Sequence, residues 1–100
     1  MNRRKKNLPY SFSLEFRRRL KAYQARHKET QDYTYPLALK LIQAVSRAPE
    51  IGVATGEGRG IYILDYEGVS LKYEYEMQYL GFGRVRFIDI RALPDRWTRD

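Results

Sequence analysis

The longest alternating run in the chain, residues 69–79, strongly constrains its fold. Apolar residues recur at every second position, and polar residues fill the places between them. The apolar set is Val69, Leu71, Tyr73, Tyr75, Met77 and Tyr79, and the polar set is Ser70, Lys72, Glu74, Glu76 and Gln78. A period of two belongs to a β-strand with one buried face. The sequence therefore predicts a long strand here.

Two further runs predict partners for this strand. Residues 61–66 are rich in β-branched and aromatic residues, and Glu67-Gly68 supplies a turn between the two runs. Gly81-Phe82-Gly83 offers a second turn before a third strand over residues 84–91. In that strand the apolar period slips between Phe87 and Ile88, which indicates either a central strand or a β-bulge. We expect a three-stranded antiparallel meander.

The first half of the chain has helical spacing instead. An apolar stripe at intervals of four, three and four predicts a first helix, and its residues are Phe16, Leu20, Tyr23 and His27. Residues 28–34 are polar and are expected to form a loop. A second helix should begin with Pro36 as its first residue and end before Pro49. Its expected apolar face consists of Leu37, Leu41, Ala44, Val45 and Ala48.

The remaining segments complete an α+β domain. Tyr10, Phe12 and Leu14 alternate with serines as in a short strand, although Ser13 could equally cap the first helix. Residues 52–60 hold four of the seven glycines and predict a loop or a mobile edge. We expect a disordered basic arm over residues 1–8 and one domain over residues 9–100, with a weak N-terminal strand, two helices and the meander in that order.

Positive charge is concentrated at one end of the chain. Residues 1–28 contain ten Lys and Arg and only one acid, Glu15, which gives a net charge of +9, whereas residues 29–100 have a net charge of −2. Such segregation attracts polyanions and favours a nucleic-acid partner. The ordinary alternative is a solubilising basic tail followed by a solvated helix face.

Composition excludes several classes of site. The absence of cysteine excludes disulfides, thiolate zinc sites and cysteine nucleophiles, and the single histidine removes most other metal sites. The glycine run fits neither GxxxxGK[ST] nor GxGxxG, so no cofactor is expected. Asn7-Leu8-Pro9-Tyr10 follows the basic start where a secretory signal would be apolar, and no run of about 20 apolar residues is present. We expect a cytoplasmic protein without membrane contact.

The element order resembles that of the RelE/ParE superfamily of bacterial toxins. The hairpin of residues 60–76 reads Gly-Ile-Tyr-Ile-Leu-Asp-Tyr-Glu-Gly-Val-Ser-Leu-Lys-Tyr-Glu-Tyr-Glu, and the last strand reads Val-Arg-Phe-Ile-Asp-Ile-Arg. The likeness covers residues 10–93 and includes the Pro-Glu-Ile-Gly turn at 49–52 and Tyr73 in the second hairpin strand. It implies a small basic protein neutralised by an antitoxin. One branch of the superfamily cleaves messenger RNA on the ribosome without a metal, and the other binds DNA gyrase.

Metal-free RNA cleavage requires a proton acceptor, cations for the phosphate and an acid for the leaving group. The candidate catalytic residues here are Arg91, Arg96 and Tyr66. Candidate nucleic-acid contacts are Arg17, Arg18, Lys21, Arg59, Lys72, Arg84 and Arg86. Where the nuclease branch carries lysines and an arginine on its strands, this chain has Ile63, Asp65 and Ser70, and Trp97 follows Arg96 without the usual Tyr or His.

Simpler interpretations exist for several of these residues. Arg84 and Arg86 could be solvated strand positions that pair across the sheet with Glu74 and Glu76. His27 lies on the apolar stripe, which favours packing or a cap at the helix end over catalysis. Three functions are therefore weighed: a toxin-like endoribonuclease with an antitoxin partner, a non-enzymatic gyrase-binding inhibitor, and a basic nucleic-acid-binding module without toxicity.

Overall fold

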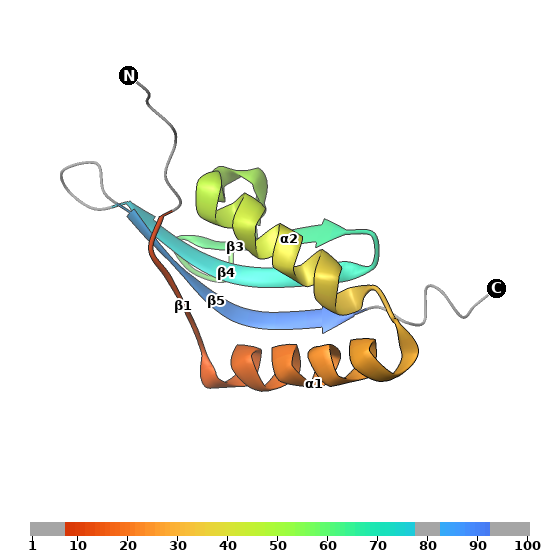
Figure 1. Ribbon diagram of the computed structural model, residues 1–100. Helices are drawn as coiled ribbons and strands as arrows, with labels where there is room; N and C mark the ends of the chain where they lie inside the picture. Colours follow the sequence, from red (N-terminus) through yellow and green to blue (C-terminus); the bar gives the residue numbers. More distant parts are fainter. Residues whose placement is uncertain (1–7, 78–82, 93–100) are drawn as a thin grey trace, which may run out of the picture.

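The computed structural model describes residues 8–77 and 83–92, and in them the chain forms two α-helices and a five-stranded mixed sheet (Figure 1). The predicted α+β class is confirmed. The elements are β1 (Tyr10–Phe12), α1 (Leu14–Thr30), α2 (Thr34–Arg47), a 3₁₀ turn η1 (Pro49–Ile51), β2 (Val53–Ala54), β3 (Ile61–Tyr66), β4 (Val69–Met77) and β5 (Gly83–Ala92). The sheet order is β1-β5-β4-β3-β2.

The sheet is larger than the three-stranded meander expected from the sequence. Strands β3, β4 and β5 pair antiparallel in succession. The weak N-terminal strand joins them as β1, which runs parallel to β5 with Tyr10 opposite Val85. Val53 and Ala54, in the segment expected to be a loop or an edge, form the two-residue edge strand β2 beside β3. Strand β1 was expected from its alternating residues, whereas the two residues of β2 are too few to show a period of their own.

The slip in the apolar pattern of β5 was expected to reflect either a central strand or a β-bulge, and the structure shows both. Tyr73 lies opposite Phe87 and its neighbour Lys72 lies opposite Asp89, so Ile88 is an extra residue in the pairing. This is a β-bulge, and it restores the burial of Ile90 after that of Phe87. Strand β5 also lies between β1 and β4, inside the sheet.

Both helices were predicted, but their ends differ from the prediction. Helix α1 continues through residues 28–30, which were expected to be loop, and stops where Gln31 adopts a left-handed φ of 63°. Helix α2 begins at Thr34, so Pro36 is its third residue and not its first. The carboxylate of Asp32 accepts a hydrogen bond from the backbone N–H of Thr34 at 2.7 Å, and this bond lowers the pKa of Asp32. The turn between the helices is therefore short and is closed by the side chain of Asp32.

The boundary of the basic arm also differs in part. Leu8 was expected to belong to that arm, yet its N–H donates to the carbonyl of Ser46 at 2.9 Å and its side chain packs against the core. Residues 1–7 lie outside the described part of the chain. The folded domain thus includes Leu8 because this residue bridges the start of the chain to the end of α2.

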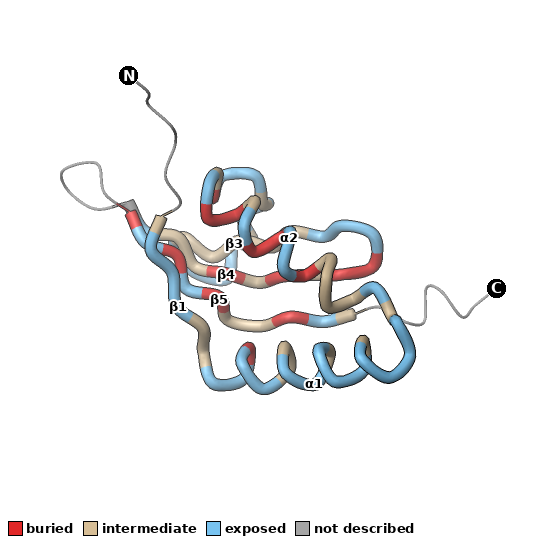
Figure 2. Tube along the Cα trace, in the orientation of Figure 1, coloured by how far each residue is buried: buried red, intermediate tan, exposed pale blue. Residues whose placement is uncertain are grey.

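One face of the sheet holds the core. Phe87 and Ile90 of β5 lie opposite Tyr73 and Leu71 of β4, on the two sides of the bulge, so the four side chains share one face, and all four are fully buried. Phe16 of α1 stacks against this face with its ring centroid 5.4 Å from that of Phe87. Helix α2 adds Ala38, Leu41, Ile42 and Val45 from the same side (Figure 2). Three residues of the apolar face expected for this helix are only half-buried, namely Leu37, Ala44 and Ala48. Neither described helix is long and apolar enough to cross a membrane.

Candidate nucleic-acid interface

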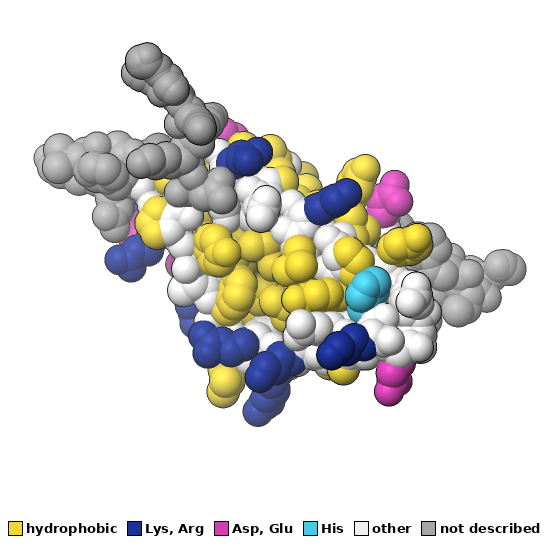
Figure 3. Space-filling model, in the orientation of Figure 1, with side chains coloured by type: hydrophobic (Ala, Val, Ile, Leu, Met, Phe, Trp, Pro, Cys, Tyr) yellow, Lys and Arg dark blue, Asp and Glu magenta, His cyan; other side chains and the backbone are white. Residues whose placement is uncertain are grey.

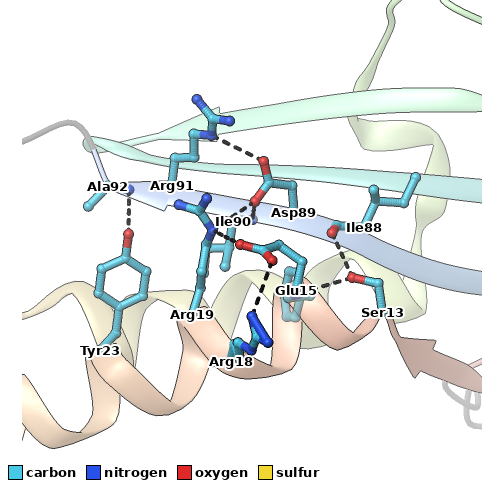
Figure 4. Close-up of polar contacts among 11 residues, drawn as sticks. Ser13, Glu15, Arg18, Arg19, Tyr23, Ile88, Asp89, Ile90, Arg91 and Ala92 are labelled. Atoms are coloured by element: carbon cyan, nitrogen blue, oxygen red, sulfur yellow. Dashed lines mark hydrogen bonds and ion pairs between the residues drawn. The ribbon is translucent and has the colours of Figure 1, made fainter.

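Helix α1 carries basic residues on two flanks of its buried stripe, and Ser13 sets its orientation. The Ser13 hydroxyl accepts from the N–H of Phe16 at 3.0 Å and donates to the carbonyl of the bulge residue Ile88 at 2.8 Å. The helix start is thereby fixed to β5 (Figure 4). Near the middle of α1, the Tyr23 hydroxyl accepts from the N–H of Ala92 at 3.1 Å. These two bonds fix the position of α1 relative to β5, and with it the positions of the two flanks.

The flank of α1 that faces β5 has acids within reach of its cations. The Arg19 guanidinium pairs with Glu15 at 3.0 Å and with Asp89 at 3.4 Å, and the Glu15 hydrogen bond, with Asp89 next, raises the pKa of Arg19. Arg26 pairs with Asp32 at 3.4 Å and lies over the ring of Tyr23. Arg18, a predicted nucleic-acid contact, also reaches Glu15, at 3.9 Å. These cations are partly neutralised.

The other flank of α1, called the outer flank below, has cations without such partners. Arg17 and Lys21, both predicted contacts, are exposed, and within the described ranges 8–77 and 83–92 their side chains form no ion pair. Lys28 extends the same flank by two turns and is likewise exposed. Figure 3 shows Lys and Arg side chains along α1, beside hydrophobic side chains that gather between α1 and α2. This flank therefore presents three exposed cations that no carboxylate of the described residues neutralises.

The cations predicted on the strands lie on the sheet face opposite the helices, and each lies near an acid. Arg84 is opposite Glu76 and Arg86 is opposite Glu74, the cross-strand alignment expected from the sequence. Lys72 pairs with Glu57 of the glycine loop at 2.9 Å. Arg59 is exposed in that same loop. The helix-free face therefore mixes both signs of charge, whereas the outer flank of α1 does not.

The structure does not bring the two described candidate catalytic residues together. Arg91 lies opposite Ser70, on the helix-free face, and its guanidinium pairs with Asp89 at 3.1 Å. Tyr66 lies opposite Val69, whose side chain is buried on the helix face, so strand alternation turns Tyr66 to the other side of the sheet from Arg91. Tyr66 is 52% exposed at the β3–β4 turn. Arg96, the third candidate, lies outside the described residues.

The single histidine has a structural role in the described chain. His27 Nδ1 lies 2.6 Å from the carbonyl of Asp32, and its ring lies beside that of Tyr35. The imidazole thus joins the end of α1 to the turn that leads into α2, which agrees with packing at a helix end. Within residues 8–77 and 83–92 no group of three His, Cys, Asp or Glu residues is placed to hold a metal ion.

A surface pocket of about 780 Å³ opens near the same end of α1. Its charged lining residues are Arg26, Lys40, Asp32 and Glu67, two of each sign, and Arg26 is already paired with Asp32. Such a balanced lining does not select an anion. None of the residues predicted from the sequence to bind nucleic acid lines this pocket.

Sequence reasoning missed two kinds of residue that shape this surface. Glu57 and Asp89 pair with predicted cations. Glu57 lies in the glycine loop, far from Lys72 in sequence, whereas Asp89 precedes Arg91 by two residues on the same strand and was detectable from that spacing. Lys28 was detectable, because it continues the helical spacing of Arg17 and Lys21 into a segment that was assigned to a loop. The sequence matches no model of a known protein family, and it matches no curated protein either.

Proposed function

We propose that this chain is a toxin of the RelE/ParE type that acts on messenger RNA at the ribosome as a metal-free endoribonuclease. The observation that carries the proposal is the exposed, unpaired cationic flank of α1 on a domain with the order strand, helix, helix, meander. That order is the one on which the resemblance to the superfamily depends. The surplus charge suits a large polyanion such as ribosomal RNA with its message.

Arg91 and Arg96 are the residues proposed to hold the scissile phosphate. Arginine suits this role because its planar guanidinium grips phosphate oxygens and stays protonated. Arg91 is 62% exposed at its side chain, so a phosphate can reach it, but the phosphate must compete with Asp89. Tyr66 is the proposed acid for the leaving oxygen. Because it lies on the other side of the sheet, the RNA would have to pass round the end of the β3–β4 hairpin to contact both residues.

The test compares message cleavage by wild type and by the Arg91→Ala, Arg96→Ala double variant in a purified translation system. Cleavage by the wild type and its loss in the double variant, by at least a hundredfold, would support the proposal. Lys40→Ala, Arg47→Ala is a matched control, since it removes two exposed cations from α2. Equal cleavage by wild type and the double variant would eliminate the proposed phosphate site.

A second function, a non-enzymatic inhibitor that binds a protein such as gyrase, is favoured by a specific observation. The two described candidate catalytic side chains lie on opposite faces, and the cation among them is held by a carboxylate. A protein that only binds its target needs no assembled catalytic group. Growth arrest on expression, with intact message and inhibited supercoiling in extracts, would favour this function over cleavage.

In both forms of the proposal the partner is an antitoxin that covers the cationic surface. An acidic, amphipathic segment of the antitoxin could contact the cations of α1 with its acids and the hydrophobic side chains between α1 and α2 with its apolar face (Figure 3). Co-expression with a neighbouring acidic reading frame should relieve growth arrest. The third function, a nucleic-acid-binding module without toxicity, would be preferred if expression caused no arrest at all.

A further inference from the structure

We propose that the outer flank of α1 is a binding surface for double-stranded RNA, formed by Arg17, Lys21, Gln24 and Lys28. These four residues recur at intervals of four, three and four, which is the spacing of the buried stripe displaced by one residue. They therefore form a straight row along the helix, here called the α1 row. All four are exposed.

The length and rigidity of the α1 row suit a regular polyanion. With a rise of about 1.5 Å per residue, the row extends for roughly 16 Å along the helix axis. Ser13, before the row, and Tyr23, near its middle, anchor the helix to β5, so the row keeps its position relative to the sheet. Cations held at fixed spacing match the repeating phosphates of a duplex backbone.

The charge balance distinguishes this row from the other basic residues of α1. Arg18, Arg19 and Arg26 each have a carboxylate within 4.0 Å, whereas the cations of the α1 row form no ion pair within the described residues. A phosphate can thus bind the row without displacing an acid, and it releases counterions as it does so. The row, and not the helix as a whole, is the nucleic-acid contact.

A duplex fits the row better than a single strand. Proteins that bind single strands stack bases on aromatic side chains. The α1 row contains no aromatic residue, and the exposed tyrosines of the described chain, Tyr10, Tyr33 and Tyr66, belong to other segments. Contacts from the row are consequently limited to the backbone of the nucleic acid.

Gln24 favours RNA over DNA. Its amide stands between Lys21 and Lys28 in the row and offers both a donor and an acceptor. The 2′-hydroxyl, also a donor and an acceptor, lines the wide minor groove of A-form RNA beside the phosphates. A row of cation, amide and cation can therefore contact phosphates and a 2′-hydroxyl together. DNA lacks the hydroxyl, so Gln24 gains nothing from it.

The experiment measures binding of the full chain to an RNA duplex of about 20 base pairs, to the DNA duplex of the same sequence and to single-stranded RNA. The Arg17→Ala, Lys21→Ala variant should weaken RNA-duplex binding at least tenfold and lower the salt slope by about two. The matched control is Lys40→Ala, Arg47→Ala on α2, which removes equal charge and should change binding less than threefold. Alanine favours helix at all four positions, so folding is preserved.

Gln24→Ala should weaken RNA-duplex binding severalfold and leave DNA-duplex binding unchanged. Equal losses in the row variant and the α2 control would overturn the proposed surface. Tighter binding of single strands, or equal binding of the two duplexes with no effect of Gln24→Ala, would overturn the choice of duplex RNA.

This inference extends the proposed action on RNA but is tested separately from it. Duplex binding is measured on purified protein and requires neither toxicity nor cleavage. A chain that binds duplex RNA through the row yet causes no growth arrest would refute the proposed function alone. A chain whose row variant keeps full duplex binding while Arg91→Ala, Arg96→Ala abolishes message cleavage would refute only the row.

Discussion

At the scale of single residues, the hydroxyl of Tyr73 joins three parts of the chain. The residue is fully buried in β4, and its hydroxyl donates to the carbonyl of Pro49 at 2.5 Å and accepts from the N–H of Gly52 at 3.0 Å. These bonds fix the 3₁₀ turn that leads from α2 to the edge of the sheet. The alternating pattern predicted that the ring packs in the core. The partners of the hydroxyl lie 21 and 24 residues away, where no local pattern points to them.

Tyr73→Phe should lower the free energy of unfolding by about 1–3 kcal/mol, because it leaves a buried carbonyl and a buried N–H without their partner. The measurement is urea denaturation followed by circular dichroism. Tyr62→Phe is the matched control. The Tyr62 ring stacks on Tyr73, but within the described residues its hydroxyl has no hydrogen bond, so a change below about 0.5 kcal/mol is expected. Equal losses in both variants would show that the ring, and not the hydroxyl, stabilises the turn.

The same tyrosine should make stability depend on alkaline pH. Burial raises the pKa of Tyr73 to about 12 from its ordinary value of 10.0. Between these values the unfolded chain releases the phenolic proton while the folded chain retains it, so the free energy of unfolding falls as pH rises. Denaturation at pH 9, 10, 11 and 12 should show a fall above about pH 10 that is smaller in Tyr73→Phe. Identical pH profiles for the two proteins would contradict this assignment.

At the scale of elements, the loop between β2 and β3 depends on glycine at one place above all. Gly60 has a φ of +77°, and a Cβ added there would lie 2.7 Å from the backbone carbonyl oxygen of Tyr75. The Gly60 carbonyl in turn accepts from the N–H of Tyr75 at 2.9 Å. The loop must therefore approach β4 more closely than any side chain allows.

Gly60→Ala should destabilise the protein by about 1–3 kcal/mol, from the left-handed backbone and the contact with Tyr75 together. Gly58→Ala in the same loop is the control. Its φ is outside the left-handed region, and an added Cβ would make only an ordinary 3.6 Å contact with Ile61. Thermal unfolding of both variants checks the prediction. A melting temperature for Gly60→Ala equal to that of Gly58→Ala would contradict the close approach.

The ends of the helices were harder to predict from the sequence than the positions of the helices and strands. The period of the apolar residues identified both helices and all three strands of the meander, because each must bury one side. Helix α1 passed its expected end since Gln31 caps it in a left-handed conformation and His27 holds the carbonyl of Asp32. Residues 28–30 are polar, and polar residues are equally compatible with an exposed last turn of a helix and with a loop.

At the scale of the whole molecule, the loop places Glu57 over the helix-free face of the sheet. Glu57 pairs with Lys72 at 2.9 Å, with Glu57 55% and Lys72 32% exposed at their side chains. Lys72, which was predicted from the sequence to contact nucleic acid, is thus already held in an ion pair. This carboxylate therefore competes with any phosphate for Lys72.

Glu57→Gln should tighten binding of RNA by up to about fivefold, the equivalent of about 1 kcal/mol for releasing a partly exposed ion pair. Glu50→Gln removes the same charge from η1, where the described structure shows no ion pair, and should leave affinity nearly unchanged. Binding titrations of both variants with one RNA give the comparison. If the two variants gain affinity equally, net charge and not the release of Lys72 is responsible.

The sequence by itself determined the α+β class, the buried face of the alternating strand β4, and the excess of positive charge near the start of the chain. Each of these is a local property, set by the spacing of apolar residues or by composition. Only the tertiary structure decided which cations keep their charge available. Lys72 and Arg19 meet carboxylates brought in by the glycine loop and by the packing of α1 on β5. Ion pairs of this kind depend on distances across the fold, and no spacing along the chain encodes them.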